Sequence, residues 1–257
     1  MLGCGVTDNM SAIYILWKRE LIRYFRSKAR LVGSLGQPLL FLVALGFGLG
    51  PIFQKAGQGN YFQFLGPGVV CMGILFTGVF AGIQVIWDRQ FGFLKETLVA
   101  PVTRFEIMMG KTLGGATVAF IQGFFVLILT MIVGFRVQHI FLIPLALVAM
   151  FLTALFFTAL GISIASVLSD MQGFQLIMNF VVQPVFFLSG ALFPLAGVVN
   201  FLSIIAYFDP LAYGVDAVRG SLTGVTHFGL TTDFTVLAII SSVIIVIGSY
   251  LFSRVEV

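Results

Sequence analysis

The chain has 257 residues, of which 59% are hydrophobic, 14% aromatic and only 9% charged, with a mean hydropathy of +1.09. This composition supplies too few polar side chains to cover a water-facing surface, which excludes an ordinary soluble globular protein. The two cysteines, Cys4 and Cys71, provide no disulfide framework. We therefore expect an integral membrane protein.

Six apolar segments are long enough to cross a hydrocarbon layer of about 30 Å. Each segment is bounded by charged residues or by Gly and Pro. They are predicted at residues 31–53, 61–86, 107–134, 141–168, 172–193 and 234–253. The sequence thus predicts an all-α membrane protein with six transmembrane helices, in a single domain over residues 1–257.

Residues 194–222, between the fifth and sixth spans, form a different kind of segment. It holds two short apolar runs, at 198–208 and 211–222. Runs of this length are too short to cross the bilayer and favour helices that enter the membrane and return to the same side. We predict a re-entrant helix pair on the outer side.

The basic residues are distributed unevenly along the chain. Eleven of the fourteen Lys and Arg precede the first span, lie between the second and third, or follow the sixth. Because basic residues concentrate in cytoplasmic loops, both termini and residues 88–111 are expected in the cytoplasm.

Residues 11–30 are predicted to form an amphipathic interfacial helix, with an apolar stripe on one side and basic residues on the other. The basic residues of this stripe are Arg19, Arg23, Arg26 and Arg30. Such a helix is expected to lie along the inner leaflet, with its arginines toward anionic headgroups. A simple topology anchor and a mechanical role both fit this pattern.

Several kinds of chemistry are missing from the sequence. No Asp, Glu, Lys or Arg lies in the middle third of a predicted span, although ion-coupled carriers usually need one there. No spacing of His, Cys or carboxylates indicates a catalytic or metal site. Gly110-Lys111-Thr112 lacks the preceding glycine of a P-loop, since Phe105 stands at that position. Energy for transport is therefore expected from another polypeptide.

Residues 88–100 are predicted to form a short cytoplasmic helix that ends at Pro101. Phe91, Leu94 and Leu98 would lie on one side and charged residues on the other. An apolar stripe below the membrane plane suits a groove on a soluble partner. A solvated loop helix is the alternative.

Amide side chains recur along the fifth span at intervals of three or four, at Gln172, Gln175, Asn179 and Gln183. Amides are costly against lipid, so this stripe is expected to face a pathway or a partner helix. Hydrogen bonding between helices explains it equally well. Glycine pairs at Gly78/Gly82 and Gly110/Gly114 favour close helix packing.

Asp209, Asp216 and Arg219 are the charged cluster of the expected outer side. Asp216 and Arg219 are three residues apart, so a helix would place them on one face. They are interpreted either as a lock of an outer gate or as a solvated pair of little energetic weight.

Three stretches resemble the type-2 ATP-binding-cassette (ABC) permeases, in the drug-resistance and polysaccharide-export branches. They are "FGFLKETLVAPVTRFEIMMGK" at 91–111, "LSGALFPL" at 188–195 and "FDPLAYGVDAVRG" at 208–220. The opening "KRELIRYFRSKARLVGSLGQPLLFL" is also similar to the start of these permeases. Asp209 stands where this family usually has Asn.

The resemblance implies a permease subunit of an ATP-driven exporter in the bacterial cytoplasmic (inner) membrane. Two nucleotide-binding subunits would bind ATP and Mg, and this chain would form a homodimer, bind no nucleic acid and hold no cofactor. Its substrate would be amphipathic, lipid-linked or drug-like. The alternative is an autonomous membrane carrier or a membrane-embedded lipid-modifying enzyme.

The resemblance also assigns roles to residues. The coupling helix at 88–100 would dock on the ATPase through Asp88, Phe91, Gly92, Leu94, Glu96, Leu98, Pro101 and Arg104. The outer gate at 194–222 would use Phe193, Pro194, Asp209, Pro210, Tyr213, Asp216 and Arg219. The candidate pathway residues are Gln175, Asn179 and Gln183.

Overall fold

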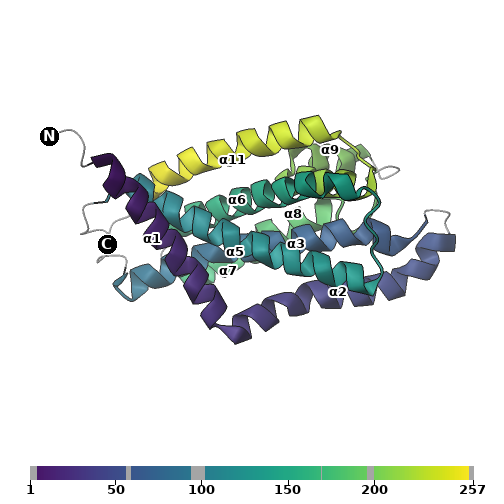
Figure 1. Ribbon diagram of the computed structural model, residues 1–257, viewed down its shortest axis with the longest axis horizontal. Coiled ribbons are helices and arrows are strands. Elements are labelled where there is room, and N and C mark those ends of the chain that lie inside the picture. The colour runs from purple at the N-terminus through teal and green to yellow at the C-terminus, as the bar shows by residue number, and fades with distance from the viewer. Residues whose placement is uncertain (1–4, 56–58, 94–101, 169, 196–199, 255–257) are drawn as a thin grey trace.

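The computed structural model describes residues 5–55, 59–93, 102–168, 170–195 and 200–254. These residues form helices and turns, and no strand occurs among them. The long helices run side by side along the longest axis, and α1 (Gly5–Arg26) crosses them at one end (Figure 1). We call this the α1 end. The opposite end, which holds α10 (Pro210–Thr223), is the α10 end.

Six helices in the described part of the chain are long and apolar enough to span a membrane. They are α2 (Lys28–Lys55), α3 (Tyr61–Gln90), α5 (Arg104–Val133), α6 (Ile143–Val167) with the preceding 3₁₀ turn Ile140–Leu142, the α7–α8 helix, and α11 (Leu230–Ser253). The α7–α8 helix runs through α7 (Met171–Ile177), a π-helical turn at Met178–Val182, and α8 (Gln183–Leu188). The six predicted spans are thus confirmed, with boundaries that differ by a few residues.

Local sequence explains where several helices begin and end. Thr103 and Glu106 form a capping box, in which each side chain accepts the backbone N–H of the other, and α5 begins there. Asn60 accepts the N–H of Phe62 at the start of α3. Gly224, with a φ of 76°, ends α10 in the left-handed conformation that glycine adopts without strain.

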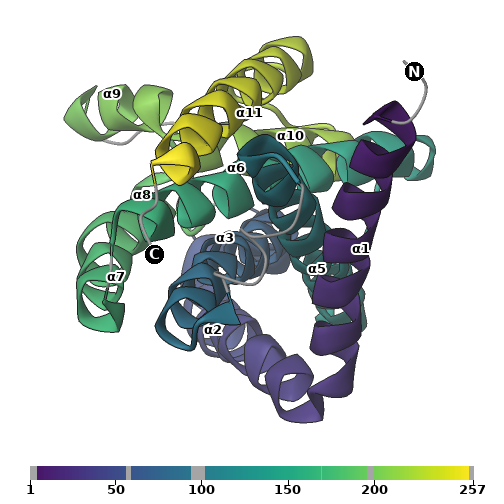
Figure 2. The same ribbon diagram turned by 90° about the vertical axis from the view of Figure 1, so that its left-hand side faces the viewer.

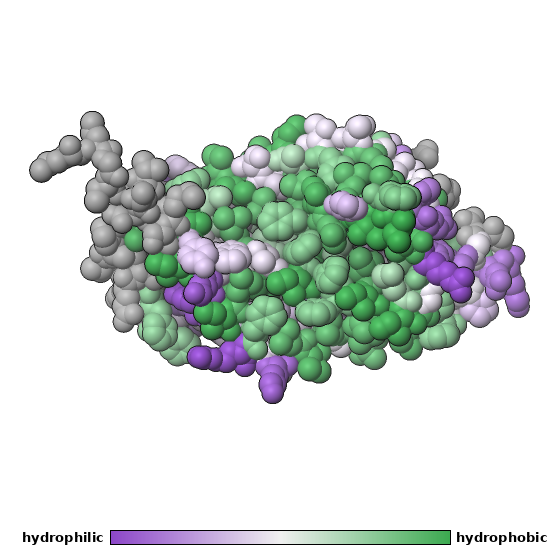
Figure 3. Space-filling view, viewed as in Figure 1, coloured by the Kyte–Doolittle hydropathy of each residue, from purple (hydrophilic) through white to green (hydrophobic). Residues whose placement is uncertain are grey.

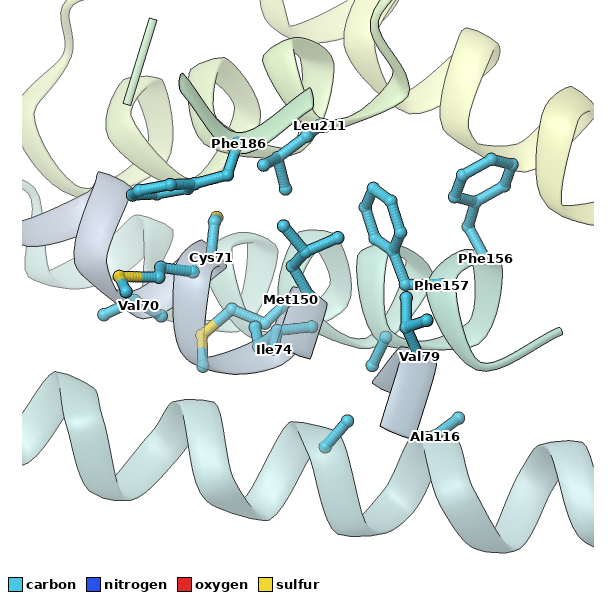
Figure 4. Packing of buried hydrophobic residues seen from close by; sticks show 14 of the residues in the cluster. Val70, Cys71, Ile74, Val79, Ala116, Met150, Phe156, Phe157, Phe186 and Leu211 are labelled. Atoms are coloured by element: carbon cyan, nitrogen blue, oxygen red, sulfur yellow. The ribbon is translucent and has the colours of Figure 1, made fainter. Parts of the chain in front are cut away.

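α3 is the central helix of the bundle and is surrounded by α2, α5, α6 and α10 (Figure 2). Its side chains Val70, Ile74 and Val79 pack among those of α5, α6 and α8 (Figure 4). Gly82 lies so close to α6 that an added Cβ would overlap the carbonyl oxygen of Gly161. The glycines of α3 therefore serve close packing, as the sequence predicts.

The fifth span changes its winding just before a proline. The π-helical turn Met178–Val182 directly precedes Pro184, which has no backbone N–H to donate to the preceding turn. A locally wider turn is one way for a helix to accommodate the missing bond.

One face of the bundle is apolar over its middle (Figure 3). Figure 3 shows apolar side chains across the centre of one face and hydrophilic ones mainly toward its two ends. This is the distribution expected of a protein whose solvent is lipid at mid-height and water at both ends.

The predicted re-entrant segment contains two short helices at the α10 end. They are α9 (Asn200–Phe208) and α10, and α10 packs against α3, α6 and α11. Asp209 caps α10 through the N–H of Leu211, and Pro210 occupies its first turn. The two expected helices are therefore present, and their path relative to the membrane stays a prediction.

Candidate functional site

A network of charged side chains lies at the α1 end and centres on Asp88 of α3, which is 3% exposed. Lys111 of α5 donates to its carboxylate across 2.5 Å. Arg19 and Arg23 of α1 approach the same carboxylate to 3.3 and 3.9 Å. One buried carboxylate thus joins three helices, and its charge compensates that of the equally buried Lys111.

This position of Asp88 corrects the expected start of the coupling helix at residue 88. α3 continues through Asp88 to Gln90, and the chain then turns at Phe91 and at Gly92, whose φ is +80°. The physical reason is the ion pair, which holds Asp88 inside the bundle as part of α3. Phe91 and Phe93 are exposed beyond it.

Most of the other predicted docking residues fall beyond this turn. Leu94, Glu96, Leu98 and Pro101 lie outside the described residues, so their docking role stays a prediction. Arg104 occupies the first turn of α5 and is partly buried. The described anchors of the segment are therefore the last turn of α3 and the first turn of α5.

Arg89, next to Asp88, joins α3 to α6. Its guanidinium donates to the carbonyl oxygens of Ser166 and Leu168 across 3.0 and 3.1 Å. These are carbonyls at the C-terminal end of α6, where backbone acceptors have no helical partner. This contact could not be foreseen from the sequence, in which Arg89 is one of the charged residues of the segment at 88–100.

α1 packs directly against α5 at Gly110 and Gly114, which have no side chain to separate the two helices. An added Cβ at Gly114 would lie 2.8 Å from the Cβ of Glu20, and one at Gly110 would lie 2.8 Å from that of Leu16. Trp17 donates to Thr117 across 3.0 Å, and Tyr24 to Gln122 across 2.6 Å. The segment at 11–30 is therefore bound to the bundle along its length.

The four arginines of the predicted interfacial helix have different surroundings. Arg19 and Arg23 are partly exposed and pair with Asp88 and Glu20, whereas Arg26 is exposed. Arg30 belongs to α2, because α1 ends at Arg26, and its side chain lies outside the described part. Contact with headgroups therefore stays a prediction for the exposed Arg26 and for Arg30.

The amide stripe of the fifth span faces away from the core of this chain. Its members Gln172, Gln175, Asn179 and Gln183 are all exposed. The opposite side of the same helix is buried, at Phe174, Met178, Val182 and Phe186. Whatever the amides face therefore lies outside this protomer.

At the α10 end, Arg219 is held by backbone groups. Its Nη2 donates to the carbonyl oxygens of Phe64 and Gly190 across 3.3 and 3.1 Å. The guanidinium carbon lies 4.1 Å from the centre of the Phe64 ring, a cation–π contact. Burial lowers the pKa of Arg219 to about 10, so the side chain remains charged at neutral pH.

Asp216 binds a different partner, which corrects the expected pairing with Arg219. Its carboxylate accepts the backbone N–H of His227 and that of Phe228, the latter across 2.8 Å. The three-residue spacing puts the two side chains near one another. Asp216 instead accepts from backbone N–H groups of the α10–α11 connection. Arg219 donates to carbonyl oxygens of α3 and of the turn after α8.

The remaining gate residues form part of the same region. Tyr213 donates to the carbonyl oxygen of Tyr207 across 2.8 Å and so ties α10 to α9. Burial raises the pKa of Asp209 to about 7. Phe193 and Pro194 are partly buried in the turn that follows α8. The predicted gate residues are thus brought together at one end, without an ion-pair lock among those described.

The described residues contain no group of three or more His, Cys, Asp or Glu side chains that could hold a metal ion. The sites defined by this chain are therefore an ion network at one end, a polar cluster at the other, and an outward amide stripe between them. Together with the six apolar helices of the described residues, they define a multi-pass membrane protein.

Comparison with known proteins gives the family. A family model described as "ABC-2 type transporter" matches residues 11–223, and the chain belongs to this family. It is 28% identical over 214 residues to a protein named transport permease ycf38 of Cyanophora paradoxa, covering 80% of this chain and 72% of that one. It is also 26% identical over 213 residues to Nodulation protein J of Rhizobium leguminosarum bv. viciae, covering 82% and 79%. The chain is therefore a membrane permease of an ABC transporter.

Proposed function

We propose that this permease exports an amphipathic, lipid-linked or drug-like substrate, driven by ATP hydrolysis on separate nucleotide-binding subunits. Two such subunits would bind ATP and Mg, and this chain would contain no ATPase site. The complex would lie in the bacterial cytoplasmic membrane. Family membership supports the association with an ATP-binding subunit.

The α1 end is proposed to face the cytoplasm. Lys18, Arg26 and Lys28 are exposed there, and α1 and the last turn of α11 lie at this same end (Figure 1). Basic residues favour the cytoplasmic side, which would put both termini there.

The Asp88 network is the observation that carries this proposal. A partner that pushes on residues 91–103 acts on the last turn of α3 and the first turn of α5. Asp88 connects those turns to α1, and Arg89 connects them to α6. Because a buried ion pair resists separation, the four helices are expected to move together. A force applied at residues 91–103 would thus tilt the four helices together.

The substrate pathway is proposed to run between two copies of this chain. Exposed amides on a membrane-spanning helix are costly against lipid, so Gln175, Asn179 and Gln183 need a protein or aqueous surface opposite them. A second copy supplies one without any further gene product. A pathway with amides on an otherwise apolar wall suits an amphipathic substrate.

Co-purification tests the proposed docking. Leu98→Asp, and separately Leu94→Asp, would place a charge on the predicted apolar stripe, and each should abolish recovery of the ATPase subunit with this chain. Thr97→Asp adds the same charge next to the stripe and should retain most of the complex. Equal recovery from all three variants, or substrate transport by this chain without any ATPase, would count against the proposal.

A further inference from the structure

The α10 end holds a half-open cavity of about 550 Å³ that the proposed coupling and pathway do not use. Its wall is formed by the last turn of α2, the start of α3, the connection between α5 and α6, the turn after α8, α10, and the α10–α11 connection. Its size falls within the range of about 300–1,000 Å³ that is common for small-molecule sites. The cavity is therefore large enough for a headgroup-sized ligand.

Arg219 is the basic side chain of the cavity wall among the described residues. Its Nη2 is used by two carbonyl oxygens, but its buried Nε has no partner. Its Nη1 has no hydrogen bond within the described part of the chain either. The guanidinium is thus fixed in place by Phe64 and two carbonyls while part of its donor capacity stays unused.

The acidic side chain on the wall is already engaged. Both carboxylate oxygens of Asp216 accept hydrogen bonds from the backbone of residues 227 and 228. The side chains of Gln138 and Thr226 also line the cavity, and neither makes a hydrogen bond to another described residue. The donors left for a ligand therefore include the Arg219 guanidinium, the Gln138 amide and the Thr226 hydroxyl, the first of which carries a positive charge.

We propose that this cavity binds an anionic oxygen group, phosphate or carboxylate, carried by a lipid headgroup or by the exported substrate. A planar guanidinium with free donors recognises such groups through charge-assisted hydrogen bonds. Phe53 and Phe64 also line the cavity and give the apolar part of the ligand a surface. The site is distinct from the amide stripe, which lies on a different helix and faces outward.

Binding to the full-length chain in dodecyl maltoside tests this site. The probes are glycerol 3-phosphate and dihexanoyl phosphatidylglycerol, which share the phosphate and differ in their acyl chains. Saturable binding of at least one probe is expected, weakened by about tenfold or more in Arg219→Gln, since charge-assisted bonds are lost. No ATP or ATPase subunit is present, so failure here would leave the proposed function untouched.

Gln138 provides a test that does not depend on the fold of the Arg219 variant. Its side chain is exposed on the cavity wall, so its replacement should not disturb packing. Gln138→Glu should weaken binding and Gln138→Lys should strengthen it, each by about fivefold. Binding of the soluble probe would show that the headgroup suffices, and binding of the acylated probe alone would identify a lipid source. Binding of neither probe, or binding unchanged by both Gln138 variants, would overturn the site.

Discussion

Lys111 of α5 donates to Asp88 of α3 across 2.5 Å, and both side chains are almost completely buried, at 3% and 5% exposed. The two residues lie 23 positions apart, on either side of the segment proposed to dock on the ATPase. Their ion pair holds the two ends of that segment close to each other. The segment is thus held on a rigid base formed by α3 and α5.

Removing one partner of this pair should be strongly destabilising. Asp88→Asn leaves Lys111 buried without a compensating charge, which typically costs about 3–5 kcal/mol. Arg19→Gln removes a partly exposed partner of the same carboxylate and should cost about 1 kcal/mol or less. Thermal unfolding in detergent measures the difference. The double variant Asp88→Leu with Lys111→Met should recover most of the loss; if it is no more stable than Asp88→Asn, the buried pair is not the cause.

The contact of α1 with α5 depends on the absence of a side chain at Gly114. Gly114→Val should lift α1, because its Cβ would lie 2.8 Å from that of Glu20. Cross-linking by a short bismaleimide between cysteines placed at Trp17 and Thr117, whose native side chains are hydrogen-bonded, reports the contact. The yield should fall several-fold in Gly114→Val. Gly33→Val is the matched control, since nothing lies within 4 Å of an added Cβ there. Equal yields in both variants would contradict the packing described for α1.

Asp209 should make stability fall as the pH rises. Burial raises its pKa from 3.8 to about 7, so the folded state favours the protonated form. The contribution of Asp209 to the free energy of unfolding is fully present below about pH 4, falls as the pH rises to about 7 and is absent above that pH. Its upper bound is about 4 kcal/mol. Asp209→Asn keeps an N-cap acceptor and should flatten this dependence in thermal unfolding between pH 5 and 8. Asp170→Asn replaces an exposed N-cap carboxylate and should leave the pH dependence of stability unaltered. If stability falls with pH as steeply in Asp209→Asn as in the unaltered protein, Asp209 is not the group responsible.

A cysteine on the amide stripe should be accessible to water. In an assembled complex, Asn179→Cys should react with a membrane-impermeant maleimide about tenfold faster than Val243→Cys, because a thiol reacts as its thiolate and lipid suppresses ionisation. Both positions are exposed on the isolated chain, so exposure alone does not separate them. Similar rates at the two positions would argue that the stripe faces lipid or a dry interface.

The spans and their order were predictable because hydropathy depends only on which residues are adjacent in the sequence. The two apolar runs after the fifth span were found for the same reason, and they correspond to α9 and α10. The packing of the glycine pairs also followed from their spacing. All of these features are local to one segment of the chain.

The polar contacts were not predictable, because they depend on which helices become neighbours. Asp88 was expected in the docking segment and Arg219 in the outer gate, and the partners of both come from other segments. Spacing suggested that Arg219 would pair with Asp216, whereas α3 and the turn after α8 supply its acceptors. A charged residue that ends a long apolar span, as Asp88 does, was the available signal for a buried pair. The direction of the amide stripe likewise required the arrangement of the other five spans.

The proposed coupling is tested most directly by identifying the protein that contacts the predicted coupling segment at residues 88–100. A photo-crosslinkable amino acid at Leu98 and, as control, at Phe141, which is 94% exposed at the α10 end, would be activated in native membranes. A cross-link from position 98 to a P-loop ATPase subunit is expected, and none from position 141. A cross-link to that subunit from position 141, or its absence from position 98 in complexes that still transport, would contradict the claim that ATP hydrolysis on another subunit moves this chain.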